Sequence, residues 1–199
     1  MRLFARLGGM NMPYRQIRAA YTEESITVYQ AYDAAIAGPA VAAQRFVAPF
    51  KRERMTWIKP SFLWMMYRCG WATKPGQERV LAVSLSREGF EWALAHSCLS
   101  HDDRRPGWSE RMRRSPVRIQ WDPERGVRHQ ALPYRSIQVG LSGEAVRRYV
   151  DEWTLAITDI TDGVREVRAA VVARADVSGL LPAERPYPLP DEIRETIGA

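Results

Sequence analysis

The chain has 199 residues, of which 46% are hydrophobic and 26% charged, with a net charge of +6. This composition supplies enough apolar residues for a core and excludes wholesale disorder. No apolar run reaches the roughly 18–20 residues that cross a bilayer, and the first residues lack the features of a secretory signal, so we expect a cytoplasmic protein without membrane contact.

The positive charge is concentrated in the N-terminal part of the chain. Residues 1–80 contain 12 basic and 5 acidic residues, a net charge of +7, whereas the remainder contains 17 basic and 18 acidic residues, a net charge of −1. Such an excess favours an anionic partner there, a nucleotide or a nucleic acid. Only three of the 29 basic residues are lysines. Arginine suits bidentate phosphate contacts, although a GC-rich genome also enriches it throughout.

The cysteines and histidines give no sign of a disulfide framework or a metal site. Two cysteines, Cys69 and Cys98, are too few for a secreted disulfide scaffold and are expected to be free thiols. Together with His96, His101 and His129 they lack the paired spacing of zinc ligands, so we expect no metal.

The first predicted elements are two strands and a helix. Alternating polar and apolar residues predict a strand over Tyr14–Tyr21, and β-branched and aromatic residues predict a second strand over Ile26–Tyr32. Asp33 is a good N-cap for an alanine-rich helix that runs toward Phe46 and is broken or kinked near Gly38-Pro39.

A short strand and a short helix follow. The pattern of Met55–Lys59 is that of a strand, and Pro60 stops it. Ser61 is the expected N-cap of a helix over residues 62–68 that Gly70 ends. Free backbone N–H groups at the start of this helix would favour an anion.

The middle of the chain contains the clearest buried strand, Arg79–Ser86, and then a helix over Glu88–His96. Residues 101–116 are polar, rich in arginine and flanked by proline, which predicts an exposed loop. Two further strands are expected over Val117–Trp121 and Ser136–Leu141.

The periodicity becomes helical after Ser142. Apolar residues from Val146 to Ile160 follow a helical stripe, and a second helix is expected to begin at Thr161 or Asp162. The prolines between residues 182 and 190 predict an extended segment on the surface.

These elements predict an α+β fold, with a mixed or antiparallel curved sheet, flanking helices and a helical C-terminal part. The regular strand–helix–strand order of a parallel sheet is absent from the sequence pattern, as is a glycine-rich phosphate loop. We expect a flexible leader over residues 1–12, one compact globular domain over 13–190 and a C-terminal tail over 191–199.

The segment from Arg54 to Trp71 is unusually rich in aromatic residues. It contains three tryptophans, a phenylalanine, a tyrosine and three methionines around Lys59 and Arg68. Because a short helix buries only one stripe, some of these rings are candidates for stacking on a base or a nicotinamide ring, with the cations beside a phosphate. The alternative is a plain core, since tryptophan and methionine commonly fill cores.

Four polar residues outside this segment are further candidates. Arg15 and Arg18 are three apart in the expected strand, so they point to opposite faces and at most one can lie beside Lys59. Gln30 is a polar residue in an apolar context, and it either orients an amide ligand or pairs with the backbone. Gln138 presents the same two alternatives.

Several long motifs resemble those of an uncharacterised family. They are YRQIRAAY, ITVYQAY, RMTWIKPSFLWMMYR, GQERVLAVSL, REGFEWAL, WDPERG and LPYRSIQVGL. They are similar to domain-of-unknown-function family 4291 from about Tyr14 to Pro190. The resemblance implies an intracellular protein and supplies no activity.

The order of the elements also resembles that of the DNA-modifying ADP-ribosyltransferases of toxin–antitoxin systems. This second resemblance implies that Gln30 and Lys59 hold NAD and that Tyr67 lies near the nicotinamide. At the place of the late catalytic glutamate of those enzymes the chain has Gln138. A glutamine can neither accept a proton nor carry the charge that stabilises an oxocarbenium-like transition state, which leaves open a different reaction or binding without catalysis.

Three functions are compatible with these features. The first is an NAD- or nucleotide-dependent transferase of ADP-ribosyltransferase type that acts on nucleic acid, and it requires a closed cleft joining Gln30, Lys59 and Gln138. The second is a non-catalytic RNA- or DNA-binding module that uses the basic and aromatic surface. The third is a structural domain whose tryptophans are core. The candidate catalytic residues are Gln138 and Tyr67, and the candidate cofactor-binding residues, with NAD as the cofactor, are Arg15, Arg18, Gln30, Lys59, Ser61 and Trp64.

Overall fold

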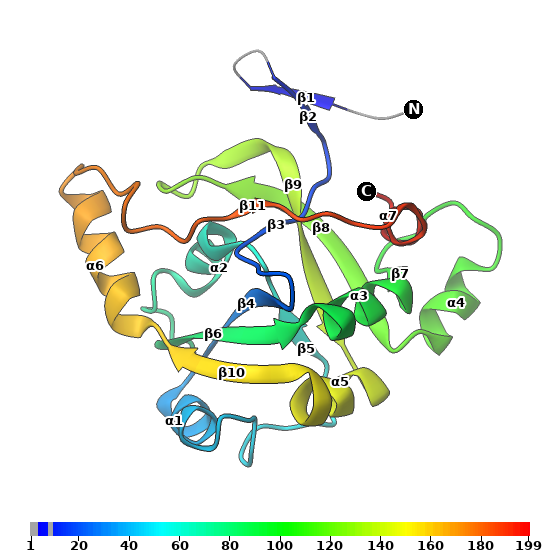
Figure 1. Ribbon diagram of the computed structural model, residues 1–199, viewed down its shortest axis with the longest axis horizontal. Coiled ribbons are helices and arrows are strands. Elements are labelled where there is room, and N and C mark those ends of the chain that lie inside the picture. The colour runs from blue at the N-terminus through cyan, green and yellow to red at the C-terminus, as the bar shows by residue number, and fades with distance from the viewer. Residues whose placement is uncertain (1–3, 8–9) are drawn as a thin grey trace.

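Two β-sheets form the centre of the computed structural model, which describes residues 4–7 and 10–199 (Figure 1). One sheet has three antiparallel strands in the order β10-β6-β4, namely β4 (Ser25–Tyr32), β6 (Arg79–Ser86) and β10 (Thr154–Asp159). The other has the order β5-β9-β8-β7, namely β5 (Thr56–Ile58), β7 (Ser97–Leu99), β8 (Val117–Arg125) and β9 (Ala131–Leu141). In the second sheet only β7 and β8 pair in parallel. The α+β class with mixed and antiparallel sheets is confirmed.

A backbone bridge joins the two sheets. The N–H of Tyr29 donates to the carbonyl oxygen of Lys59 at 2.7 Å, and the N–H of Lys59 donates back to Tyr29 at 3.3 Å. Because β5 ends at Ile58, Lys59 lies where the chain leaves one sheet and touches the other. The strands of the two sheets run in different directions on either side of this point (Figure 1).

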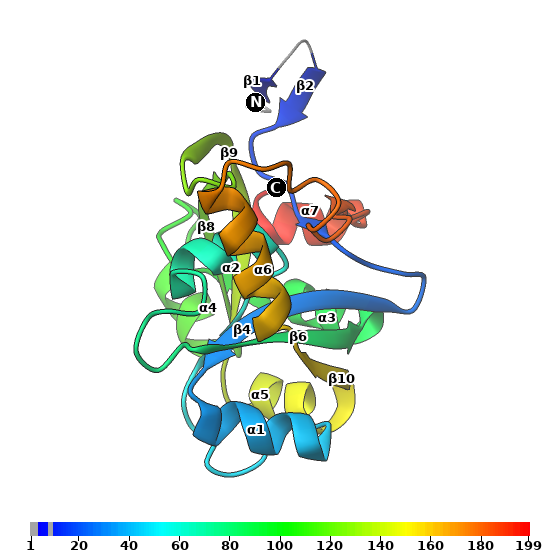
Figure 2. The same ribbon diagram turned by 90° about the vertical axis from the view of Figure 1, so that its left-hand side faces the viewer.

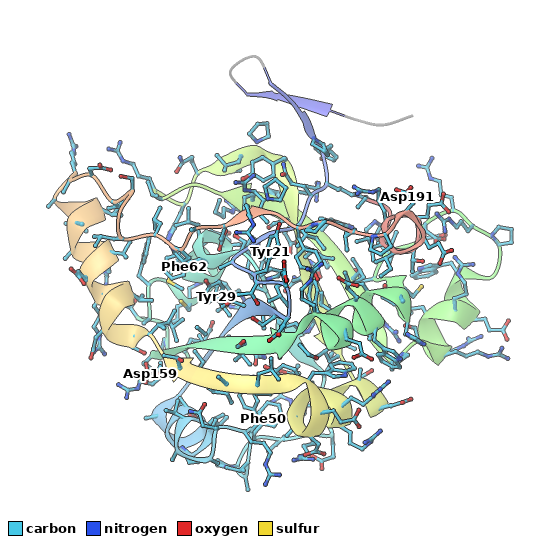
Figure 3. The ribbon with its side chains drawn as sticks, in the orientation of Figure 1. Tyr21, Tyr29, Phe50, Phe62, Asp159 and Asp191 are labelled. Atoms are coloured by element: carbon cyan, nitrogen blue, oxygen red, sulfur yellow. The ribbon has the colours of Figure 1, made fainter. Side chains whose placement is uncertain are left out.

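Helices α1 (Ala34–Ala43) and α2 (Phe62–Cys69) cover opposite faces of the three-stranded sheet (Figures 1 and 2). On the α2 side, the rings of Tyr29 and Phe62 meet edge to face with their centroids 5.4 Å apart (Figure 3). Within the described part of the chain, no helix is long and apolar enough to span a lipid bilayer. The other helices are α3 (Arg87–Ala95), α4 (Trp108–Arg114), α5 (Glu144–Arg148), a π-helical segment (Tyr149–Trp153), α6 (Thr161–Val172) and α7 (Asp191–Ile197).

The predicted helix signals around α1 and α2 are confirmed. Asp33 caps α1 by accepting from the N–H of Ile36 at 3.0 Å, and Ser61 caps α2 by accepting from the N–H of Trp64 at 3.3 Å. Gly70 ends α2 in the left-handed conformation, with a φ of 60°. Helix α1 continues through Pro39 and is not broken there.

The structure corrects the expected helix over residues 146–160. The helical stripe holds only as far as Trp153, after which the chain forms strand β10. Ile157 pairs with Val83 of β6 and is buried. A buried apolar residue at this position fits the alternation of a strand as well as it fits a helical stripe. Periodicity alone does not distinguish the two over so short a run.

Two other segments differ from their predictions. Of the strand expected over Tyr14–Tyr21, only β3 (Arg18–Ala19) forms, and it pairs with β11 (Arg185–Pro186). The expected loop over residues 101–116 contains helix α4, whose residues are all partly or fully exposed. Its surface position therefore agrees with the prediction, although its conformation does not.

Both ends of the chain contain secondary structure. The expected leader over residues 1–12 lies partly outside the described residues, and its described parts pair as β1 (Phe4–Leu7) and β2 (Met10–Pro13). The expected tail over residues 191–199 forms α7, whose Ile197 is fully buried. The carbonyl oxygen of Ile197 accepts from the indole N–H of Trp121 at 2.8 Å. The C-terminal residues are therefore packed on the domain.

At Gly89 on α3, side-chain packing and helix propensity predict opposite effects of an alanine substitution. A Cβ atom at Gly89 would lie 2.3 Å from Cγ of Trp153, so alanine fits only if the helix moves. We expect Gly89→Ala to lower the free energy of unfolding by about 1–3 kcal/mol, although alanine favours helix over glycine. In the matched control, Gly163→Ala on α6, the new Cβ meets no atom within 4 Å. The control should gain up to about 1 kcal/mol. Urea unfolding of both variants measures this, and effects of the same sign would contradict it.

Candidate functional site

A cleft of about 780 Å³ lies where β4, β5, α2 and the β8–β9 pair meet. This volume is within the range of small-molecule sites. Its polar lining consists of Gln30, Thr56, Lys59, Gln77, Gln120, Asp122 and Gln138, and its aromatic lining of Tyr32, Phe50, Trp57 and Trp64. The ring of Phe50 is labelled in Figure 3, on the α1 side of the molecule.

The amine of Lys59 is buried in the wall of the cleft. The residue is 2% exposed, and its Nζ lies 3.6 Å from the centroid of the Trp64 ring and 3.5 Å from Oδ2 of Asp122. The latter distance is long for a hydrogen bond, and Nζ has no hydrogen-bond partner within the described residues. Burial lowers the pKa of Lys59 to about 7, and attraction by Asp122 and Glu124 limits the decrease. Much of this amine is therefore neutral near neutral pH, in the form that acts as a base or a nucleophile.

The carboxylate of Asp122 is held in place by two glutamines. Gln120 donates to Oδ1 at 2.9 Å, and Gln138 donates to Oδ2 at 2.9 Å. Gln120 and Gln138 lie opposite each other in the β8–β9 ladder, and alternation puts Asp122 on the same face. The Asp122 side chain is 18% exposed and lines the cleft. Asp122 belongs to no group of three metal-ligating side chains among the described residues.

Gln30 lines the cleft, but its side chain is bonded within the fold. Its Nε2 donates to Oγ1 of Thr56 at 2.8 Å and to the carbonyl oxygen of Trp57 at 2.9 Å. Its Oε1 accepts from the hydroxyl of Tyr149 at 2.6 Å. Both amide protons are used, so the geometry favours a structural role for Gln30 over a ligand-orienting one.

Trp57 forms part of the cleft wall because the strand beside it has a glycine. Trp57 pairs with Gly140 in the register of β5 and β9. A Cβ atom on Gly140 would lie 2.9 Å from Cη2 and Cζ2 of Trp57. The indole ring therefore lies directly against the backbone of β9. The side chain of any larger residue at position 140 would occupy the space of this ring.

Three cations lie on the exposed part of the cleft lining: Lys51, Arg54 and Arg68. None of them forms an ion pair or a side-chain hydrogen bond within the part of the chain that the structure describes. Unpaired guanidinium and ammonium groups at a cleft attract phosphate groups. Part of the positive charge excess of residues 1–80 therefore lies at this cleft.

The start of α2 already holds a carboxyl group from the chain itself. Oε1 of Glu184 accepts from the N–H of Phe62 at 2.7 Å. The hydroxyl of Ser61 donates to Oε1 of Glu124 at 2.9 Å while it caps the N–H of Trp64. The N–H groups of Phe62 and Trp64 at this helix start are therefore bonded, and Ser61, 2% exposed, does not line the cleft.

Besides Ser61, three of the predicted site residues lie outside the cleft: Arg15, Arg18 and Tyr67. Arg15 donates to the backbone at the end of α7 at 2.8 Å, and Arg18 donates to the carbonyl oxygen of Glu184 at 3.0 Å. Both arginine side chains therefore bind the backbone of the C-terminal segment. Tyr67 is 37% exposed and stacks with the guanidinium of Arg125, which lies 3.8 Å from its ring centroid.

Four predicted residues do meet in the cleft: Gln30, Lys59, Trp64 and Gln138. Two cleft residues were not predicted: Asp122, because the expected strand ended at Trp121, and Gln120, which lay inside that strand but was not singled out. Continuing the alternation of VRIQWDPER by one residue puts Asp122 on the face of Gln120, so the signal was present in the sequence.

Comparison with known proteins gives one family. The family model described as "Domain of unknown function (DUF4291)" matches residues 16–187. The matched range includes both sheets, α2 and every residue of the cleft lining. No curated protein matches the chain.

The burial of Lys59 is expected to reduce stability at neutral pH. Folding lowers its pKa from 10.5 to about 7, so unfolding takes up a proton between these values and stability rises with pH across that window. Methionine fills a similar volume without charge, and Asp122 keeps its two glutamine partners. We expect Lys59→Met to raise the free energy of unfolding at neutral pH by about 2–4 kcal/mol, with the gain shrinking toward about pH 10.

Chemical denaturation at several pH values measures this effect. Lys51→Met, which removes an exposed lysine of the same cleft, is the matched control and should change stability by less than about 0.5 kcal/mol. A loss of stability in Lys59→Met that does not depend on pH would contradict the expectation.

Glu184 is expected to give the opposite pH dependence. Burial, with repulsion by Glu124, raises its pKa from 4.5 to about 8. The folded state therefore keeps a proton that the unfolded state loses, and the stabilisation present below the unfolded pKa is lost as pH rises to about 8. Glu184→Gln keeps an acceptor oxygen for Phe62. It should be more stable than wild type by about 1–3 kcal/mol near pH 8 and close to wild type near pH 5.

The same denaturation series tests this, with the exposed Glu166→Gln on α6 as the control. An equal shift in both variants, or a Glu184→Gln variant that is less stable at the higher pH, would show that the Glu184 carboxyl is ionised in the folded protein.

Proposed function

The chain belongs to the family described as a domain of unknown function, DUF4291, and we propose that it is an NAD-dependent transferase of ADP-ribosyltransferase type acting on a nucleic acid. The observation that carries the proposal is the Asp122 carboxylate, which Gln120, Gln138 and Lys59 surround in the cleft. Asp122 offers the negative charge that Gln138 cannot carry.

The lining of the cleft suits a dinucleotide. Trp57, Trp64 and Phe50 offer ring faces for stacking on nicotinamide or adenine. The cations Lys51, Arg54 and Arg68 suit a diphosphate. The amide oxygens of Gln120 and Gln138 accept no hydrogen bond within the described residues, so they are free for ribose hydroxyls or a carboxamide.

The chemistry assigns separate roles to Asp122 and Lys59. Asp122 stabilises the positive charge that develops on the ribose as the bond to nicotinamide breaks and its electron pair leaves with nicotinamide. Lys59, as a neutral amine, accepts the proton that the acceptor nitrogen or oxygen loses when it bonds to the same ribose carbon. Gln138 then serves to position Asp122, and Tyr67, Arg15 and Arg18 have no part in the site.

Nicotinamide release with a single-stranded DNA or RNA acceptor tests the proposal. We expect Asp122→Asn to lower the rate of release by about 10²–10⁴-fold, because the amide keeps the shape but not the charge. NAD binding measured by calorimetry should change much less. Asp162→Asn, an exposed residue on α6, is the matched control and should leave the rate unchanged.

A protein that neither binds NAD nor releases nicotinamide would overturn the proposal. If DNA or RNA still binds with an affinity that falls steeply with added salt, the cations of the cleft serve a non-catalytic nucleic-acid-binding module instead.

A further inference from the structure

We propose that Lys59 is a nucleophilic amine that captures a phosphorylated aldehyde or ketone in the cleft as an imine. This inference rests on the geometry around the amine and is independent of ADP-ribosyl transfer. It concerns a covalent step at Lys59 that the proposed transferase does not require.

The first support is a buried amine without a hydrogen-bond partner among the described residues, whose ion-pair partner Asp122 lies 3.5 Å away. The side chain of Lys59 is among the largest fully buried ones in the protein, yet Lys59 lines the cleft and its Nζ forms no hydrogen bond within the described residues. A buried polar atom without a partner is costly, and its presence at a cavity wall indicates a ligand group that completes it.

The second support is the fixed position of the amine. The N–H and the carbonyl oxygen of Lys59 are both bonded to Tyr29, and the rigid ring of Pro60 follows. The side chain rests on the face of Trp64, with Nζ 3.6 Å from the ring centroid. Backbone and side chain are therefore both held, which places the nitrogen lone pair in one location before any ligand arrives.

The third support is a carboxylate beside the amine. Oδ2 of Asp122 lies 3.5 Å from Nζ, and Gln120 and Gln138 hold the carboxylate on its other sides. Glu124 is the other acidic group whose charge acts on Lys59, and no cation among the described residues does so. The burial that lowers the pKa of Lys59 to about 7 makes the neutral amine available at neutral pH.

The reaction needs no group beyond these two side chains and the ligand. The lone pair of the neutral Nζ attacks the carbonyl carbon, and the carbonyl π electrons move to its oxygen. Asp122 carries two protons in turn from nitrogen to that oxygen: the first gives the carbinolamine, and the second lets the oxygen leave as water when the C=N bond forms. The net change is amine plus carbonyl to imine plus water, with no oxidation or reduction.

The ligand class follows from the rest of the lining. Lys51, Arg54 and Arg68 suit a phosphate at the exposed part of the cleft. The free amide oxygens of Gln120 and Gln138 suit hydroxyl groups between that phosphate and the amine. A sugar phosphate in its open-chain carbonyl form has these three features.

The small number of lysines makes a sharp experiment possible. The chain has only Lys51, Lys59 and Lys74, and the other two are exposed. Wild-type protein is treated with pyridoxal 5′-phosphate at neutral pH, reduced with borohydride and digested, and the label on each lysine is measured by mass spectrometry. We expect Lys59 to be labelled at least about 10-fold faster than Lys51 and Lys74, although it is the most buried. The N-terminal peptide gives a separate signal.

Three further measurements distinguish a reactive amine from an amine that is merely accessible to the reagent. The rate at Lys59 should be half-maximal near pH 7, and ribose 5-phosphate should protect Lys59 and not Lys74. Asp122→Asn should slow labelling of Lys59 by about 10-fold and leave Lys74 unchanged. Labelling that follows exposure, with Lys59 the slowest, would overturn the inference.

The outcome is distinguishable from that of the proposed function. Nicotinamide release without selective labelling of Lys59 would support the transferase and refute imine formation. Selective labelling without nicotinamide release would do the reverse.

Discussion

The backbone bridge between Tyr29 and Lys59 is the constraint on which the site depends. It fixes the point at which the two sheets touch, and Pro60, which has no N–H to donate, stops the strand directly after it. Ser61 then begins α2 as an N-cap. Within three residues the chain ends a strand, joins two sheets and starts a helix, and Lys59, at this junction, lines the cleft.

The C-terminal segment holds this junction from the other side. Glu184 caps the first N–H of α2, Arg18 binds the backbone of Glu184, and Trp121 donates to the backbone of Ile197.

A side chain also protects the outer strand β10 of the three-stranded sheet, where the amide of Gln44 both donates to and accepts from the backbone of Ile157. The side chain takes the place of a missing neighbouring strand, which blunts an edge that would otherwise be free to pair.

Local signals predicted the fold near the site well because local chemistry determines it there. Asp33, Ser61 and Gly70 act where the sequence placed them, and β6 has the predicted bounds. Lys59, Trp64, Gln30 and Gln138 were all placed in one site from sequence, and they line one cleft. The failures involve distant partners: β10 is a strand because β6 lies beside it, and Glu184 reaches α2 from 122 positions away. Arg15 and Arg18 were misplaced because the strand assumed for them is only two residues long.

Lys59 is difficult to explain as a core residue. A methionine at the same position would fill the space against Trp64 without the desolvation of an amine, and replacing buried charges by apolar groups is often neutral or stabilising. A residue that lowers stability and remains part of an otherwise well-packed cleft is typical of a functional site. The same argument applies to Asp122, whose two glutamine partners hold it beside the amine. A carboxylate stabilises a cationic ribosyl carbon, and a neutral amine attacks a carbonyl carbon, so which of the two acts is decided by the carbon that the ligand presents between them.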